Sequence, residues 1–240
     1  MEKINLFCLP FAGGNKYSYR KYEEKSPPFI NLIPLEYPGR GSRVQEPLLG
    51  DVTELLDDLY QQIKSRVDRG SYAIYGHSMG GLMACLLARK VIENGHSSPL
   101  HLFITGTTGP SALSRKDKKR HLLGKKEFME EVKSLNGTLE DILQNEELLE
   151  YLEPILRADF KVIESYNHTE IPPLDIAITV ITGTQEDMTM EDIYLWQKET
   201  SAAVNFIRMP GNHFFINQYP FEIIQVIARK LVGHTKTYAS

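Results

Sequence analysis

The sequence is poor in cysteine and in long apolar runs. Its 240 residues include only Cys8 and Cys85, and both lie in segments with the pattern of a buried strand and a buried helix. Two such cysteines cannot build the disulfide framework typical of small secreted proteins. No stretch approaches the ~18 apolar residues that a membrane-spanning helix needs, and the N-terminus shows no signal-peptide pattern. We therefore expect a soluble cytoplasmic protein without disulfides.

A strong excess of one charge is also absent. The chain has 27 Lys and Arg against 31 Asp and Glu, and this net charge of -4 gives no reason to expect a nucleic-acid binder. Hydrophobic residues make up 42% and charged residues 24%, which indicates a globular core rather than a disordered chain. The length fits one α/β domain with room for an insertion, so we expect residues 1–240 to form a single domain.

Short apolar runs alternate with helical patterns along the chain. The runs favour strands and lie at Ile4–Leu9, Phe29–Leu35, Tyr72–Tyr75, His101–Thr105, Ile176–Ile181 and Val204–Arg208. They are largely apolar rather than alternating, which is typical of parallel strands covered by helices on both faces. Helical patterns begin near Asp51, Met79 and Glu191 and after Pro220. This alternation predicts an α/β fold built on a mainly parallel sheet.

One stretch, residues 110–173, breaks this alternation. It contains no convincing strand and instead shows helical patterns at Lys126–Leu135, Leu139–Leu143 and Glu146–Tyr166. Connections of this length between two strands of a parallel sheet usually carry function. We therefore expect this stretch to form a helical lid insertion over a functional site.

The pentapeptide from Gly76 to Gly80 matches G-x-S-x-G, with Ser78 at its centre. A strand-like run precedes it and a helical pattern follows it. This is the setting of the sharp, strained turn that exposes a nucleophilic serine at the N-terminus of a helix. Small residues on either side of the serine let the strand and the helix approach closely. The motif in this setting predicts an α/β-hydrolase fold with Ser78 as its nucleophile.

A serine hydroxyl needs a general base, and His213 fits that role by its position after the last strand-like run. The acid should follow the preceding run, where both Glu186 and Asp187 are within reach. We prefer Asp187, because aspartate is the commoner third member of such triads, with Glu186 as the alternative. No pair of histidines has HExxH spacing, so we expect no metal, and this chemistry needs no cofactor.

A glycine pair, Gly13 and Gly14, follows the first strand-like run. Glycines at such a turn allow backbone N–H groups to face the site without side-chain obstruction. The N–H groups of Ala12 and Met79 are therefore our candidates for binding the oxyanion of a tetrahedral intermediate.

Four segments carry a more specific pattern. They are Leu9–Gly14 (LPFAGG), Tyr37–Arg43 (YPGRGSR), Gly76–Gly81 (GHSMGG) and Leu152–Phe160 (LEPILRADF). Together they resemble the type II thioesterases of nonribosomal peptide and polyketide synthesis, over about Leu6 to Leu231. The resemblance implies a stand-alone enzyme, expected to be monomeric. Its substrates would be acyl thioesters on the phosphopantetheine arm of acyl- or peptidyl-carrier domains.

The resemblance does not decide which carboxylate is the acid of the triad. Members of that family commonly place it three residues after the glycine that ends the strand, and counting from Gly183 this is Glu186. Residue type favours Asp187. Other activities of the fold are alternatives: a fatty-acyl thioesterase, a carboxylesterase, an acyltransferase, or a carrier-binding protein without catalysis.

Two basic features also have alternative interpretations. Arg40, which is flanked by glycines, can contact the pantetheine or brace its own loop. The basic residues between Arg115 and Lys126 can steer an acidic carrier domain toward the site, or can form an ordinary solvated surface.

Overall fold

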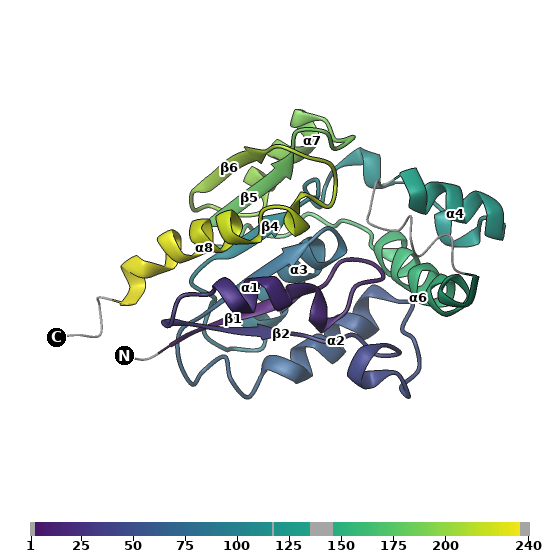
Figure 1. The fold of residues 1–240 in the computed structure, drawn as a ribbon. Helices are drawn as coiled ribbons and strands as arrows, with labels where there is room; N and C mark the ends of the chain where they lie inside the picture. Colours follow the sequence, from purple (N-terminus) through teal and green to yellow (C-terminus); the bar gives the residue numbers. More distant parts are fainter. Residues whose placement is uncertain (1–2, 117, 135–145, 236–240) are drawn as a thin grey trace.

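A sheet of six strands forms the centre of this computed structural model, which describes residues 3–116, 118–134 and 146–235 (Figure 1). The strands are β1 (Ile4–Leu9), β2 (Ile30–Pro34), β3 (Tyr72–His77), β4 (Leu102–Thr105), β5 (Ile178–Gly183) and β6 (Val204–Met209). They are ordered β2-β1-β3-β4-β5-β6, and every neighbouring pair is parallel. The predicted parallel sheet is confirmed, and each strand overlaps its predicted run.

The register brings the loops that matter for function together. Leu9 at the end of β1 pairs with Gly76 near the end of β3, so the loop after β1 lies beside the turn after β3. Gly183 at the end of β5 pairs with Met209 at the end of β6, which places the next two loops side by side. All four loops leave the same edge of the sheet, because parallel strands share one carboxyl edge.

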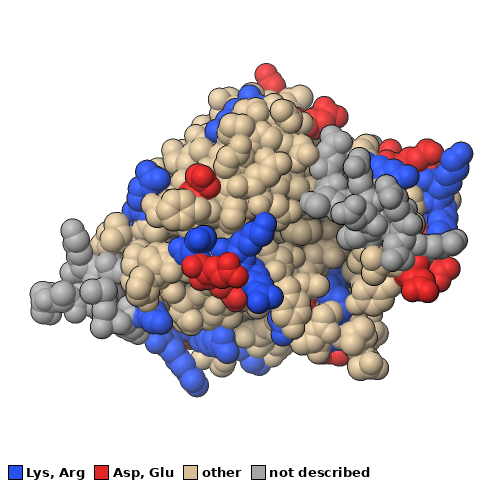
Figure 2. Space-filling model, in the orientation of Figure 1, with Lys and Arg blue, Asp and Glu red and all other residues tan. Residues whose placement is uncertain are grey.

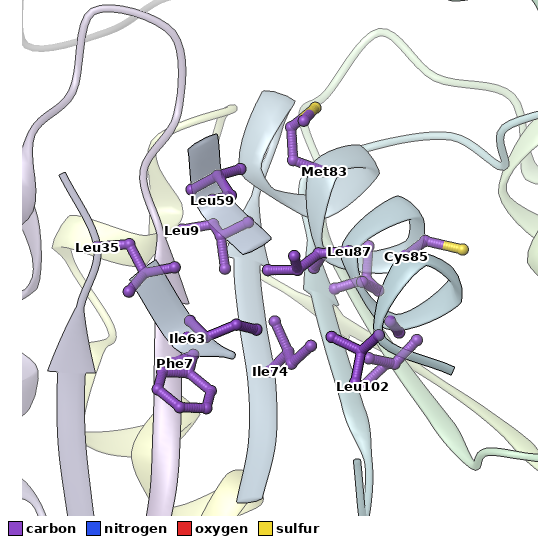
Figure 3. Packing of buried hydrophobic residues seen from close by; sticks show 14 of the residues in the cluster. Phe7, Leu9, Leu35, Leu59, Ile63, Ile74, Met83, Cys85, Leu87 and Leu102 are labelled. Atoms are coloured by element: carbon purple, nitrogen blue, oxygen red, sulfur yellow. The ribbon is translucent and has the colours of Figure 1, made fainter. Parts of the chain in front are cut away.

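Successive strand residues face two hydrophobic clusters on opposite sides of the sheet. Phe7 and Ile74 belong to the cluster under α2 (Val52–Ile63) and α3 (Met79–Glu93), part of which is shown in Figure 3. The neighbouring strand residues pack instead with α1 (Arg20–Lys25) and α8 (Pro220–Thr235). Both faces are therefore buried, which explains why the strand runs are continuously apolar.

The helix boundaries follow local signals where those signals exist. Asp51 caps α2, because its side chain accepts from the backbone N–H groups of Thr53 and Glu54. After α3 the chain turns at Gly95, which has a φ of +78°. The short α1 was not predicted, because Tyr22 is its only buried side chain and it shows no apolar period.

The helix expected at residues 191–200 is shorter than predicted. Only α7 (Met190–Tyr194) is α-helical, with Thr189 as its N-cap, and a 3-10 turn follows over Leu195–Lys198. That turn contains Trp196, which is fully buried and donates a 3.0 Å hydrogen bond to the carbonyl oxygen of Thr107. A tertiary contact thus accompanies the change of helix type.

The insertion between β4 and β5 contains α4 (Lys125–Ser134) and α6 (Glu146–Ser165). The third helix expected there, Leu139–Leu143, lies outside the described residues. A small hydrophobic cluster joins the two helices, with Phe128 on α4 and Phe160 on α6 in edge-to-face contact. Figure 1 shows both helices at the end of the molecule opposite the start of β1. None of the described helices has the length and apolar character needed to cross a membrane.

Candidate active site

Ser78 occupies the turn between β3 and α3. Its backbone has a φ of 54° and a ψ of −114°, and it is the only non-glycine residue with positive φ in the described part of the chain. Its backbone N–H donates to the carbonyl of Thr105 at 2.8 Å, which ties the turn to β4. Such a strained conformation persists only where the surroundings enforce it, and it is typical of functional sites.

The two glycines of the pentapeptide are required by close contacts between backbones. A Cβ atom at Gly76 would lie 2.0 Å from the carbonyl oxygen of Gly80. A Cβ atom at Gly80 would lie 2.1 Å from the carbonyl oxygen of Leu9. The turn can therefore form only if both positions lack a side chain, which agrees with the reason given for the motif.

His213 lies between Ser78 and a carboxylate. Its Nε2 is 3.0 Å from Ser78 Oγ, and its Nδ1 is 2.6 Å from Glu186 Oε1. A carboxylate only accepts hydrogen bonds, so Nδ1 carries the proton and Nε2 is free to accept the serine proton. The histidine comes from the loop after β6 and the glutamate from the loop after β5.

Glu186, rather than Asp187, makes the contact with the histidine. Its other oxygen accepts from the backbone N–H of Gly183 at 2.6 Å, and its side chain is only 3% exposed. Asp187 lines the neighbouring cavity. The geometry therefore favours Glu186 over the preferred Asp187 as the carboxylate that contacts the imidazole. Residue type was a poor guide because the turn after Gly183 decides which carboxylate reaches the imidazole.

His77, next to Ser78 in sequence, is fully buried and packs against His213. Its ring centroid is 4.9 Å from that of His213, and its Nδ1 lies 3.0 Å from Thr105 Oγ1. Burial, followed by the charge of His213, holds the pKa of His77 well below its usual value. A neutral ring therefore supports His213. Gly106 makes room for it, since a Cβ there would lie 2.3 Å from His77 Cε1.

The candidate oxyanion groups lie at the same cavity as Ser78. Ala12, Met79, Ser78 and His213 all line one cavity of about 460 Å³. Within the described residues, no hydrogen bond is made by the N–H of Ala12 or Met79. The N–H of Gly13 is already used, because it donates to Asp159 Oδ2 at 2.7 Å.

The cavity extends from Ser78 and His213 to the helical insertion. Val132 of α4 and Leu156, Phe160 and Ile163 of α6 line it opposite the loops of the sheet. An acyl group bound to Ser78 would thus meet apolar side chains of the insertion. Sequence reasoning named none of them as substrate contacts, because apolar residues at helical spacing are more often core.

Arg40 braces its own loop. Its guanidinium makes two hydrogen bonds to Asp159 of α6, at 2.5 and 2.7 Å, and both side chains are at most 4% exposed. It also donates to the carbonyl of Gly14 at 3.4 Å. Of the two interpretations of Arg40, the structure supports the brace. Sequence reasoning missed Asp159, although it lies in a segment that carried the family resemblance.

The basic residues of the insertion divide into two groups. Arg115 and Arg120 are engaged within the protein: Arg115 donates to the carbonyl of Thr108 at 2.8 Å, and Arg120 pairs with Glu164 at 2.8 Å. Burial lowers the pKa of Arg115 to about 10. Lys116, Lys118 and Lys119 are exposed.

Comparison with known proteins identifies the family of this chain. The family model described as "Thioesterase domain" matches residues 4–231. Gramicidin S biosynthesis protein GrsT from Aneurinibacillus migulanus is 32% identical over 230 residues, which cover 95% of this chain and 89% of that protein.

Solved structures give the same result. ClbQ from the colibactin NRPS/PKS pathway superposes with a TM-score of 0.90 at 31% identity, covering 97% of this chain and 98% of that one. The type II thioesterase BorB from the borrelidin biosynthetic cluster superposes with a TM-score of 0.86 at 31% identity, covering 95% and 93%. This chain is therefore a member of the thioesterase family, with an α/β-hydrolase fold.

Proposed function

We propose that this thioesterase is a type II enzyme that removes acyl groups from phosphopantetheine arms of nonribosomal peptide or polyketide carrier domains. The observation that carries the proposal is the hydrogen-bonded series Ser78–His213–Glu186 opening into one cavity with Ala12 and Met79. Among the relatives named above, ClbQ comes from an NRPS/PKS pathway, BorB is a type II thioesterase from a biosynthetic cluster, and GrsT is a gramicidin S biosynthesis protein. The catalytic roles of these five residues are part of the proposal.

The first half of the reaction forms an acyl-enzyme. His213 Nε2 takes the proton of Ser78 as Oγ attacks the thioester carbonyl, and Glu186 stabilises the imidazolium that results. The carbonyl oxygen becomes an oxyanion that accepts from the N–H groups of Ala12 and Met79. The C–S bond then breaks, and His213 returns its proton to the departing pantetheine thiolate.

The second half releases the acid. Water loses a proton to His213 Nε2 and attacks the ester carbonyl of acylated Ser78. The second oxyanion uses the same two N–H groups. Collapse returns the proton to Ser78 Oγ and frees the carboxylic acid.

We also propose that residues 110–173 act as a lid over this cavity within a single domain of residues 1–240. The support is that α4 and α6 both contribute cavity-lining side chains. Figure 2 shows Lys, Arg, Asp and Glu intermixed around α4, at the right of the view, rather than one continuous basic patch. Steering of an acidic carrier domain would then rest on a few exposed lysines.

Charge reversal tests that steering directly. The variant Lys116→Glu/Lys119→Glu changes two exposed side chains and spares Arg115 and Arg120. We expect lower kcat/KM for acyl-carrier substrates at low salt and little change at high salt or with a small acyl thiol. Unchanged carrier turnover at every salt concentration would show that these lysines have no role in docking.

The function is tested by mass spectrometry of acylated carrier domains before and after addition of the protein. We expect loss of the acyl mass from the carrier, with the free acid as product, and no loss with Ser78→Ala. Turnover of a matched oxygen ester faster than the thioester would instead indicate a carboxylesterase. Transfer of the acyl group to an added amine or alcohol would indicate an acyltransferase.

We further propose that the enzyme acts as a monomer in the cytoplasm. Cys8 and Cys85 are both buried and unpaired, which is compatible with a reducing compartment. Sedimentation at micromolar concentration should give a mass close to 27.4 kDa. A mass of twice that value would contradict the monomer.

A further inference from the structure

The loop after β1, residues Pro10–Gly14, is here called the oxyanion loop. A carboxylate from the helical insertion holds it: Asp159 of α6 accepts the N–H of Gly13 at 2.7 Å through Oδ2. The same oxygen accepts from Arg40 Nη1 at 2.5 Å, while Oδ1 accepts from Nη2 at 2.7 Å. Arg40 in turn donates to the carbonyl of Gly14. The ion pair therefore forms hydrogen bonds with two successive residues of the loop, Gly13 and Gly14.

Other contacts fix the remainder of the oxyanion loop. Tyr37 Oη donates to the carbonyl of Pro10 at 2.8 Å, and the N–H of Gly14 donates to the carbonyl of Phe11 at 2.9 Å. Among the described residues, the N–H of Ala12 is left without an acceptor. The loop is thus held on both sides of Ala12, whose N–H is the group of this loop that the proposed mechanism uses.

Helix α6 also packs directly on this loop. A Cβ atom at Gly13 would lie 2.7 Å from Leu156 Cδ2, so this side chain of α6 packs against the backbone of the loop. Gly13 also has a φ of +78°, which glycine adopts at little cost. The contact between α6 and the oxyanion loop therefore depends on Leu156 of the helix and on the conformation of Gly13 in the loop.

Stability alone does not account for the ion pair. The side chains of Arg40 and Asp159 are 4% and 1% exposed. Replacing a buried ion pair with apolar residues of similar volume is often neutral or stabilising. An apolar pair cannot, however, accept the N–H of Gly13 or donate to the carbonyl of Gly14. The distinctive contribution of the charged pair is the orientation of the loop.

We infer that Asp159 and Arg40 are positioning residues that orient the N–H of Ala12 toward the oxyanion, so that α6 forms part of the catalytic frame as well as covering the cavity. The inference rests on the proposed function, because it assigns these residues to the transition state of that reaction. Neither residue touches the reacting atoms in this assignment. Their loss should therefore lower kcat more than it changes KM.

The test uses two variants of the full-length protein. In Arg40→Met/Asp159→Leu both charges are replaced by apolar groups, so the fold is kept while the acceptor for Gly13 is lost. We expect a melting temperature near that of the wild type, KM within about twofold, and kcat lower by about 10- to 100-fold. Asp159→Asn keeps one carbonyl acceptor, and we expect a smaller fall in kcat, of about 3- to 10-fold.

A matched control separates positioning from stability. Glu199→Gln breaks another buried ion pair, in which Arg89 and Glu199 meet at 2.8 Å with side chains 9% and 5% exposed. Neither residue lines the cavity. We expect this variant to lose melting temperature and to keep wild-type kcat.

A second readout targets the oxyanion itself. An acyl trifluoromethyl ketone forms a tetrahedral adduct with the serine, so its affinity should fall by the same factor as kcat/KM in both variants. The inference is overturned if either folded variant keeps wild-type kcat, or if KM rises while kcat does not change. If the double variant does not fold, Asp159→Asn decides between these outcomes. Failure of the proposed function looks different, because the wild type and Glu199→Gln would then also leave the acyl-carrier thioester intact.

Discussion

At the scale of single residues, the position of one carboxylate decides how the histidine is held. Glu186 turns back toward the end of β5, where Gly183 donates to one of its oxygens and His213 donates to the other. A Cβ at Gly183 would lie 2.5 Å from the carbonyl oxygen of Gly211. The loop that carries Glu186 and the loop that carries His213 therefore also meet at a glycine. The imidazole is therefore oriented by contacts that both loops fix.

Substitution at the two candidate acids should give unequal results. Glu186→Gln is nearly isosteric but cannot stabilise the imidazolium, and we expect kcat to fall by about 10³- to 10⁴-fold. Asp187→Asn should change kcat by less than about tenfold, because the contact with the imidazole is made by Glu186. Steady-state kinetics on one acyl thioester measures both. A larger loss at Asp187 than at Glu186 would refute the assignment.

At the scale of elements, the approach of β3, α3 and the oxyanion loop is set by glycines that the motif already marks. Gly80 lies in the first turn of α3 directly against the carbonyls of Leu9 and Pro10. A methyl group there would push the helix away from the end of β1. Ser78 and the oxyanion loop would then separate.

A pair of glycine-to-alanine variants tests this contact. We expect Gly80→Ala to lower the free energy of unfolding by about 1–3 kcal/mol or more, and to reduce kcat. Gly233→Ala, on α8 with no atom near the added Cβ, should instead raise it by about 0.5–1 kcal/mol. Urea denaturation measures both changes. Equal effects would mean that the close contact does not limit the turn.

The comparison of sequence and structure also belongs to this scale. β1 is predicted with its correct ends, because a buried parallel strand is marked by a continuous apolar run. The pairing of Asp159 with Arg40 could not be predicted, since 119 residues separate the two and no local pattern marks their contact. Local patterns identify elements and motifs, whereas the contacts between distant loops that complete the site depend on the tertiary fold.

At the scale of the whole molecule, buried histidines link stability to pH. His101 stacks on Phe103 and lies 2.8 Å from Thr179 Oγ1. Burial, with the nearby charges of Lys230 and His234, lowers its pKa to about 4. On lowering the pH, His101 of the unfolded chain therefore binds a proton near pH 6.5, whereas His101 of the folded chain binds it only near pH 4.

The sign of the effect follows from that difference. The contribution of His101 to stability is complete above about pH 6.5 and is lost as the pH falls toward 4, by about 1 kcal/mol per pH unit. His101→Gln keeps a polar partner for Thr179 but does not titrate, so its stability should fall less steeply over this range. Denaturant titrations at several pH values compare the two slopes. If the free energy of unfolding of the two proteins changed with pH at the same slope, His101 would be protonated equally in the folded and unfolded states.

The central claim is that Ser78 carries the acyl group during hydrolysis of a carrier-bound thioester. The most direct measurement is rapid-quench mass spectrometry of the enzyme mixed with an acylated carrier domain. The account predicts a transient mass increase of one acyl group on the peptide containing Ser78, which appears as the carrier loses that mass and is absent in Ser78→Ala. Release of the acid at an undiminished rate by Ser78→Ala, without any acyl-enzyme, would contradict it.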